Sequence, residues 1–237
     1  MMEMNYISVD IETTGLSPIK DKIIEIGAVK VIEGKIVDQF QTLIDPQMNL
    51  SERIVELTGI TDEMVTGKDA IEQVIEYFLA FAEELPLLGH NILFDYSFLK
   101  TAATKQKKSF ERKGIDTLLI SRRLHEELPS KTLDSMCSYY GILNEHHHRA
   151  LEDAIASMQL YEKLGMEEDA TQEILAAKPL AYRPKKMEPA TTRQKKMLLD
   201  LLKYHKIENR QFIDTMTKSE ASRAIDKILF QYGRKLD

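Results

Sequence analysis

Residues 7–16, ISVDIETTGL, join a strand-like apolar run to two acids, Asp10 and Glu12, which one apolar residue separates. Side chains at positions i and i+2 of a strand project from the same face, so we expect these two carboxylates to lie side by side. Adjacent carboxylates repel one another unless a cation neutralises them, and Mg²⁺ and Mn²⁺ prefer oxygen ligands. The stretch therefore predicts a buried strand whose end carries metal ligands.

The two acids alone are weak evidence, because an Asp-x-Glu triplet is expected by chance roughly once in a chain of this length. Two solvated acids at a strand end are the alternative interpretation. Two further acids strengthen the metal hypothesis: Asp95 follows a short apolar run where a helix should begin, and Asp153 lies in the first turns of another predicted helix. His148, five residues before Asp153, adds an imidazole that titrates near neutral pH. Such a set would suit a hydrolytic centre with two metal ions about 3.5–4 Å apart.

Three motifs in this order, VDIETTGL (9–16), GHNILFDYSFL (89–99) and HRALEDA (148–154), resemble those of the DnaQ-like DEDDh 3′–5′ exonucleases. The segments DKIIEIGAVKV (21–31) and ELTGITDEMV (56–65) are also similar to that family, above all to the proofreading modules of bacterial replicative polymerases such as DNA polymerase III. The resemblance covers about residues 4–167. It implies an α/β, ribonuclease-H-like fold in which helices flank a central mixed sheet.

The same resemblance assigns roles to individual residues. It implies that Asp10, Glu12, Asp95 and Asp153 hold two Mg²⁺ or Mn²⁺ ions, with Asp95 acting partly through water, and that His148 is the general base. A tyrosine-type site would need a tyrosine four residues before Asp153, and that position is Arg149. The residues implied to hold the terminal nucleotide and its scissile end are Thr13, Thr14, Leu16, His90, Asn91 and Phe94.

The implied activity is metal-dependent hydrolysis that releases nucleoside 5′-monophosphates from single-stranded or frayed DNA 3′ ends. The protein would then be a proofreading-type subunit with a DNA polymerase as partner, or a stand-alone repair exonuclease. Two alternatives stay open: an RNA-trimming 3′–5′ exoribonuclease, and a non-catalytic module that binds nucleic acid or a polymerase. The presence of every residue that the motifs require favours an enzyme.

The charge of the chain is divided unevenly. Residues 1–177 contain 17 lysines and arginines against 31 acidic residues, whereas residues 178–237 contain 15 against 7. A basic segment of this kind could attract a polyanion, although a solvated lysine-rich helical surface is the alternative. The sequence has one cysteine, no apolar run long enough to span a membrane and no signal-like start, so we expect a cytoplasmic protein without membrane contact.

Three segments are predicted along the chain. Residues 1–168 form the exonuclease domain, and residues 169–190, with three prolines in 179–190, form a linker. Residues 191–237 form a basic module of two amphipathic helices, weakly similar to SAP-like modules and suited to DNA binding or partner docking. In it, Thr217 and Glu220 fit a capping box and Gly233 fits a helix stop.

Some residues are expected to have ordinary structural roles. The HHH run at 146–148 could bind zinc, but loop residues are favoured because no cysteine supports such a site. His125 and His205 are predicted to be surface residues. Four aromatic residues on predicted helices are expected in the core rather than stacked on bases; these are Phe78, Phe81, Tyr139 and Tyr140.

Overall fold

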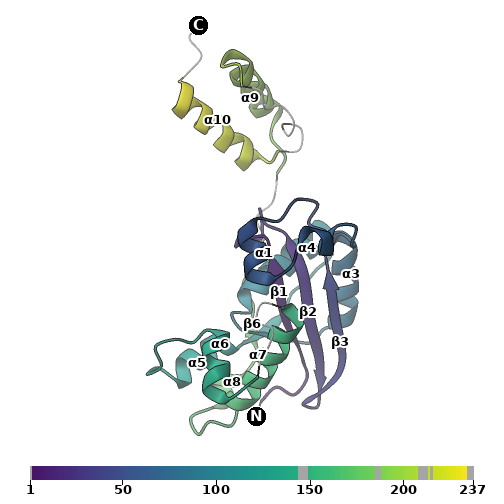
Figure 1. Ribbon diagram of the computed structural model, residues 1–237, viewed down its shortest axis with the longest axis vertical. Helices are drawn as coiled ribbons and strands as arrows, with labels where there is room; N and C mark the ends of the chain where they lie inside the picture. Colours follow the sequence, from purple (N-terminus) through teal and green to yellow (C-terminus); the bar gives the residue numbers. More distant parts are fainter. Residues whose placement is uncertain (1, 144–148, 185–187, 208–212, 214–215, 234–237) are drawn as a thin grey trace. The chain divides into compact units, whose positions relative to one another are not determined.

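The computed structural model describes residues 2–143, 149–184, 188–207, 213 and 216–233. The chain divides into two compact units, Met1–Pro184 and Lys185–Asp237, which are described separately (Figure 1). Among the described residues, no helix is long and apolar enough to cross a membrane.

The first unit is built on a six-stranded sheet with the strand order β3-β2-β1-β4-β5-β6. Its strands are β1 (Tyr6–Thr13), β2 (Ile23–Ile32), β3 (Lys35–Leu43), β4 (Leu87–Gly89), β5 (Lys113–Asp116) and β6 (Lys178–Pro179). The first three strands pair antiparallel, β4 and β5 continue parallel to β1, and β6 closes the edge antiparallel. The mixed sheet that the sequence predicts is therefore confirmed.

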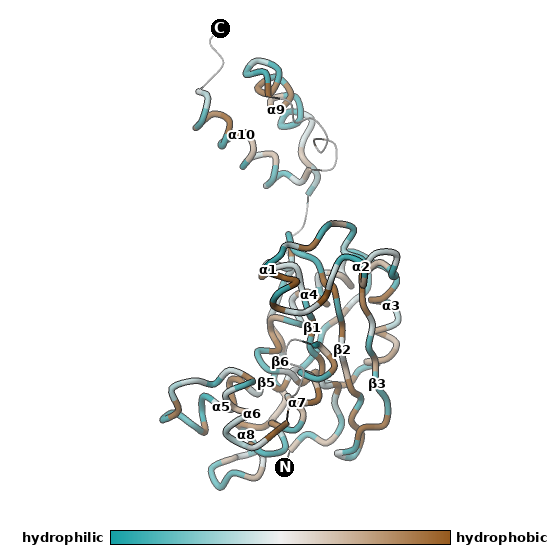
Figure 2. The backbone as a smooth tube through the Cα atoms, in the orientation of Figure 1, coloured by the Kyte–Doolittle hydropathy of each residue, from teal (hydrophilic) through white to brown (hydrophobic). Residues whose placement is uncertain are grey.

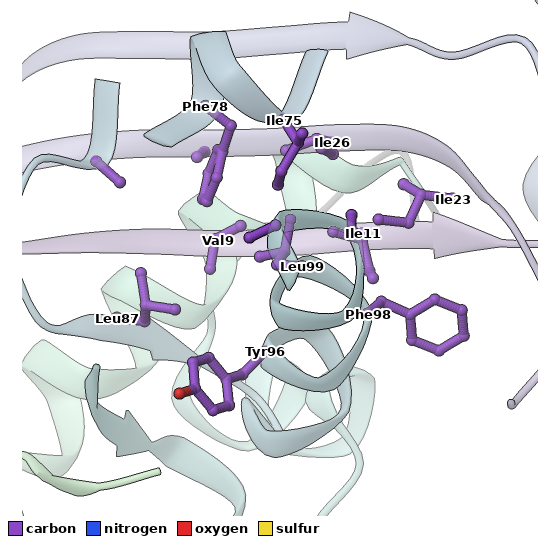
Figure 3. Close-up of a cluster of buried hydrophobic side chains, with 14 of the residues drawn as sticks. Val9, Ile11, Ile23, Ile26, Ile75, Phe78, Leu87, Tyr96, Phe98 and Leu99 are labelled. Carbon is purple, nitrogen blue, oxygen red and sulfur yellow. The ribbon is translucent and has the colours of Figure 1, made fainter. Parts of the chain in front are cut away.

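Helices cover both faces of this sheet (Figure 1). They are α1 (Glu52–Thr58), α2 (Asp62–Val65), α3 (Ile71–Ala82), α4 (Leu93–Lys105), α5 (Thr117–Leu124), α6 (Leu133–Tyr140), α7 (Ala150–Leu164) and α8 (Gln172–Leu175). On one face, apolar residues of α3 and α4 pack on Val9, Ile11 and Ile26 (Figure 3). On the other face, the cluster of α5, α6 and α7 includes Tyr6 and Val29.

The alternation of β1 decides which side chains meet α7. Ile7, Val9 and Ile11 belong to the core cluster with α3 and α4. The intervening residues therefore point to the opposite face. There the Oγ atom of Ser8 donates a hydrogen bond of 2.6 Å to the carbonyl of Ala154 in α7. Asp10 and Glu12 continue along this face, and β1 thus directs its acids towards the start of α7.

The segment expected to be a linker is partly folded into the first unit. Leu175 of α8 is buried and its carbonyl accepts a hydrogen bond of 3.0 Å from the hydroxyl of Tyr161. Lys178 and Pro179 pair with β5. A proline is tolerated there because β6 is an edge strand, where a backbone N–H can be spared. The unit consequently extends to Pro184 rather than ending near residue 168.

The second unit contains α9 (Thr192–Tyr204) and α10 (Lys218–Tyr232), packed through an apolar cluster. Figure 2 shows hydrophobic and hydrophilic residues alternating along both helices, as amphipathic helices require. Each helix begins with a capping box, and the one predicted at Thr217 and Glu220 is confirmed. Gly233 ends α10 with positive φ, as its position in the sequence predicts.

The histidine and aromatic predictions are only partly correct. Phe78 is buried, but Tyr139 is 53% exposed and therefore lies outside the core. The surface prediction for His125 is wrong, because its ring is buried and its Nε2 atom bonds the hydroxyl of Tyr140. His205 lies half-buried between two tyrosine rings. The zinc alternative at 146–148 concerns three residues that all lie outside the described ones.

Candidate active site

Asp10 and Glu12 of β1 meet Asp153 in the first turn of α7. One carboxylate oxygen from each of the three residues lies within 4.8 Å of the others. The bond from Ser8 to Ala154 holds β1 against α7 directly beside Asp153. Asp10 and Asp153, which are 143 positions apart in the sequence, are thus brought together by the packing of α7 on β1.

Asp95 reaches the same place from α4. Its Oδ1 atom accepts a hydrogen bond of 3.1 Å from the backbone N–H of Ile11, which lies between the two acids of β1. That N–H is available because β4 pairs with β1 only as far as Ser8. The Asp95 side chain is buried, and it stands outside the group of three carboxylates that could share one ion.

Burial and mutual repulsion dominate the electrostatics of these acids. Burial, together with the charges of Asp95, Asp153 and Glu12, raises the pKa of Asp10 well above its usual range. Burial is also the main cause that raises the pKa of Glu12 to about 8 and that of Asp95 to about 8. Acids in such a state are costly to ionise without a cation. An all-oxygen donor set of this kind fits a hard divalent ion such as Mg²⁺ or Mn²⁺.

The raised pKa values predict that metal binding depends on pH. Glu12 and Asp95 must lose their protons to bind an ion, so Mn²⁺ binding near pH 7 should release protons. Affinity should then rise as the pH approaches and passes about 8. Calorimetric titration in two buffers with different heats of ionisation measures this release directly. Binding at pH 7 without proton release would contradict the prediction.

A fifth carboxylate, which the sequence analysis did not identify, supports the site from β2. Glu25 lies opposite Glu12 in the strand register and is fully buried. Its oxygens accept hydrogen bonds from Arg149 Nη2 at 2.9 Å, Arg149 Nε at 3.2 Å and the N–H of Ala150 at 3.2 Å. Glu25 thereby fixes the start of α7. The signal in the sequence was an acid within the otherwise apolar strand segment IIEIGAV.

Gly27 lies on the same face of β2 and allows α7 to approach closely. A Cβ atom at this position would stand 2.0 Å from the N atom of Leu151 and 2.2 Å from the carbonyl carbon of Ala150. Both are backbone atoms, so no side-chain rotation can relieve the overlap.

Gly27→Ala should therefore displace α7, destabilise the protein by about 1–3 kcal/mol or more, and lower activity. Thermal unfolding together with a hydrolysis assay measures both effects. Gly165→Ala is the matched control, because the three atoms nearest to its Cβ would all belong to the flexible side chain of Met2. Equal and small effects of the two substitutions would contradict this account of Gly27.

The turn after β1 presents the next group of predicted residues. Thr13 is buried and donates a hydrogen bond of 2.7 Å to the carbonyl of Gly15, and Thr14 Oγ1 accepts one of 2.9 Å from the N–H of Lys22. These bonds hold the turn in shape. Leu16 at its tip is 86% exposed and leaves a large apolar side chain in solvent.

The predicted residues around α4 have different surroundings. His90 contacts protein through both ring nitrogens, Nδ1 with Thr117 Oγ1 at 2.9 Å and Nε2 with the Lys131 carbonyl at 2.7 Å. Burial lowers its pKa, which favours the neutral ring. Asn91 has a positive φ and donates its N–H to Asp116, while Phe94 packs on Phe98 with ring centroids 5.1 Å apart.

His148, the predicted base, lies outside the described residues, and the structure resumes with Arg149 as the residue before α7. Its role therefore stays a prediction, as do the individual roles of the other site residues.

A mixed sheet flanked by helices, with acids from β1, α4 and α7 at one point, defines a nuclease of the ribonuclease-H-like class. The chain belongs to the RNase T family of DnaQ-like exonucleases, whose model, described as Exonuclease, matches residues 7–161. The resemblance found in the sequence is thereby confirmed. The family works with divalent metal ions, and Asp10, Glu12 and Asp153 form a group that could hold one.

Individual relatives agree with this assignment. The chain is 44% identical over 163 residues to a DNA polymerase III PolC-type of Caldanaerobacter subterraneus subsp. tengcongensis, a match that covers 69% of this chain and 12% of the polymerase. The chain thus corresponds to about an eighth of the length of the curated relatives that it matches.

Solved structures show the same fold. Exonuclease X in complex with 5′ overhanging duplex DNA has a TM-score of 0.58 and 28% identity, over 71% of this chain and 95% of that one. E. coli Exonuclease I in complex with a dT13 oligonucleotide has a TM-score of 0.62 over 69% of this chain and 41% of that one. At 19% identity, the latter likeness concerns the fold alone.

Proposed function

We propose that this chain is a metal-dependent 3′–5′ exonuclease that releases nucleoside 5′-monophosphates from single-stranded or frayed DNA ends. The observation that carries the proposal is the cluster of Asp10, Glu12 and Asp153, with Asp95 bound to the backbone between the first two. Membership of the exonuclease family and the similarity to Exonuclease X support it.

The acidic residues and His148 have different roles in the proposed hydrolysis. Two Mg²⁺ or Mn²⁺ ions, when bound, would neutralise the charge that develops on the scissile phosphate. Asp10, Glu12, Asp95 and Asp153 would hold them. His148 accepts the proton of the attacking water at a ring nitrogen. An oxygen–phosphorus bond forms as the bond from phosphorus to the 3′ oxygen of the shortened strand breaks. That oxygen takes up a proton from water, and the nucleoside 5′-monophosphate departs.

The terminal nucleotide is placed by the turn after β1 and the start of α4. The exposed side chain of Leu16 and the ring of Phe94 would contact its base, and Thr13, Thr14 and Asn91 would lie beside the sugar and phosphate. His90 shapes the loop before α4 through its two protein contacts. Because such contacts need an unpaired nucleotide, single-stranded or frayed ends are the substrate.

The substrate is DNA rather than RNA, and the role is in proofreading or repair. The curated relative is a DNA polymerase, of which this chain matches a small part, and the structural relative Exonuclease X was seen with DNA. A DNA polymerase is accordingly the protein partner that we propose, with the cytoplasm as the compartment. The two alternatives to this proposal are an RNA-trimming enzyme and a non-catalytic binding module, and the test distinguishes them from it.

The test is hydrolysis of 5′-labelled single-stranded DNA and RNA of matched sequence, with Mg²⁺, Mn²⁺ or EDTA. Wild type should shorten DNA from the 3′ end only with metal, and His148→Ala should lose this activity. Asp38→Asn, which removes an exposed carboxylate on β3, is the control and should behave as wild type. Preference for RNA would indicate the RNA-trimming alternative, and inactivity of wild type on both strands would overturn the proposal.

A further inference from the structure

The two units of the chain carry opposite net charge. Lys185–Asp237 contains 13 lysines and arginines against 7 acidic residues, whereas Met1–Pro184 contains 19 against 31. A nucleic-acid strand is a polyanion, so the first unit repels it at long range and the second attracts it. A substrate that must reach a cluster of acids therefore gains from a basic unit on the same chain.

Helix α10 displays two cations and an aromatic ring on one face, beside the exposed carboxylate of Asp226. Arg223, Lys227 and Phe230 are exposed and follow one another at i, i+4 and i+7, so they form a stripe along the helix. Phe230 is 95% exposed. The opposite face, with Ala221 and Ile225, is buried against α9. The stripe therefore takes no part in the core of the unit.

More aromatic surface lies where the two helices end. The rings of Tyr204 and His205 have centroids 4.8 Å apart, and those of His205 and Tyr232 lie 5.4 Å apart. Tyr204 and Tyr232 are 43% and 49% exposed. Tyr232 lies nine residues after Arg223, on the opposite side of α10 from the stripe, so these rings form a separate aromatic surface.

The face of α10 is held in a fixed position by bonds at the other end of the helices. The Nε2 atom of Gln194 in α9 donates hydrogen bonds of 3.0 Å to the Lys218 carbonyl and 2.9 Å to Ser222 Oγ. The backbone N–H of Lys218 donates 2.8 Å to the Glu188 carbonyl. The stripe is thus presented by an ordered helix, which limits the entropy lost on binding.

We propose that Arg223, Lys227 and Phe230 of α10 form a binding surface for single-stranded nucleic acid. The two cations contact phosphates, and the ring of Phe230 stacks on bases, which a duplex does not expose. The surface raises the concentration of strands around the first unit because both units belong to one chain. The benefit of this raised concentration rests on the proposed exonuclease function, whereas the binding of the strand to α10 does not.

Binding is measured with the full chain in EDTA, so that no strand is cut, as the fluorescence anisotropy of a labelled thymidine oligonucleotide of about 30 nucleotides. The double variant Arg223→Glu/Lys227→Glu should weaken binding at least about tenfold and lower the salt slope by about 1.4. Phe230→Ala should weaken binding about fivefold or more and leave the salt slope unchanged. The two kinds of contact are thereby separated.

The matched control is Lys196→Glu/Lys203→Glu, which changes two exposed lysines of α9. Its net charge equals that of the α10 double variant, so it should lose much less affinity if the α10 face is the binding surface. Equal losses would show attraction by net charge alone. Wild-type affinity in every α10 variant, or equally tight binding of a duplex, would also overturn the proposal, and the former outcome would indicate a protein partner instead.

A second assay keeps this proposal separate from the enzymatic one. The p-nitrophenyl ester of thymidine 5′-monophosphate needs only the site in the first unit. The α10 variants should hydrolyse it like wild type, while their KM for the long oligonucleotide rises and kcat is unchanged. If wild type fails to hydrolyse the ester with either metal, the proposed function fails while the anisotropy result still stands.

Discussion

Replacing Asp10 with asparagine is expected to lower hydrolysis at least about a thousandfold while making the metal-free protein more stable. The carboxylate of Asp10 lies among Glu12, Asp95 and Asp153, and burial raises its pKa well above the usual range. Without metal, the ionised form of Asp10 therefore destabilises the folded state. Asparagine removes that charge and also removes a metal ligand.

The pH dependence follows from the direction of the shift. Because the folded protein holds protons on these acids that the unfolded chain has lost, the stability of the metal-free wild type falls as the pH rises. The fall begins above about pH 4, the ordinary value for aspartate, and for Glu12 and Asp95 it continues to about 8. Asp10→Asn should thus gain most near pH 8 and little near pH 4.

Thermal unfolding in EDTA at several pH values measures this gain, which should reach about 4 °C or more at pH 8. Added Mn²⁺ should stabilise wild type and leave the variant nearly unchanged. Asp38→Asn, far along the sheet edge, controls for the loss of any carboxylate and should shift neither curve. If Asp10→Asn melts at a lower temperature than wild type at pH 8 in EDTA, ionised Asp10 does not destabilise the metal-free fold and this prediction is wrong.

The parts of the fold that the sequence could predict depend on local periodicity. The alternation of β1 was enough to place Asp10 and Glu12 on one face, and the helix patterns of the sequence were enough to place Asp95 and Asp153 at helix starts. The capping box at Thr217 was also readable, because its residues are three positions apart.

The parts that could not be predicted depend on pairing between distant segments. Glu25 and Arg149 are 124 residues apart, and neither shows from its neighbours that the other will be its partner. The pairing of Lys178 and Pro179 with β5 likewise joins distant residues, whereas the three prolines in 179–190 favoured a linker. His125 looked like a surface residue because its burial depends on Tyr140 of another helix.

The ion pair between Glu25 and Arg149 is expected to respond unequally to the loss of its two members. Arg149→Ala leaves the Glu25 carboxylate, which is 0% exposed, without its cation, and breaking such a pair costs about 3–5 kcal/mol. Glu25→Gln leaves a guanidinium whose side chain is 33% exposed and can be hydrated. Its amide oxygen can still accept from the N–H of Ala150. We therefore expect Glu25→Gln to cost only about 1–2 kcal/mol.

Activity should fall in both variants, because the pair holds the residue before α7 and thereby the position of Asp153. A displacement of about 1 Å in a catalytic group can cost about a hundredfold in rate. Arg149→Ala has a second effect. Burial raises the pKa of Glu12 to about 8, and Arg149 is a nearby charge that opposes this rise. The variant should therefore need a higher pH for half-maximal activity than Glu25→Gln does.

Urea unfolding gives the two stabilities, and pH–rate profiles with Mn²⁺ give the two activities. The double variant Glu25→Gln/Arg149→Gln removes both charges and should recover part of the stability that Arg149→Ala loses, since no buried charge is left alone. If the two single variants lose the same free energy of unfolding, the buried Glu25 carboxylate does not depend on Arg149 for its stabilisation. If both fold fully and keep the rate and pH profile of wild type, the pair stabilises α7 without positioning Asp153 for catalysis.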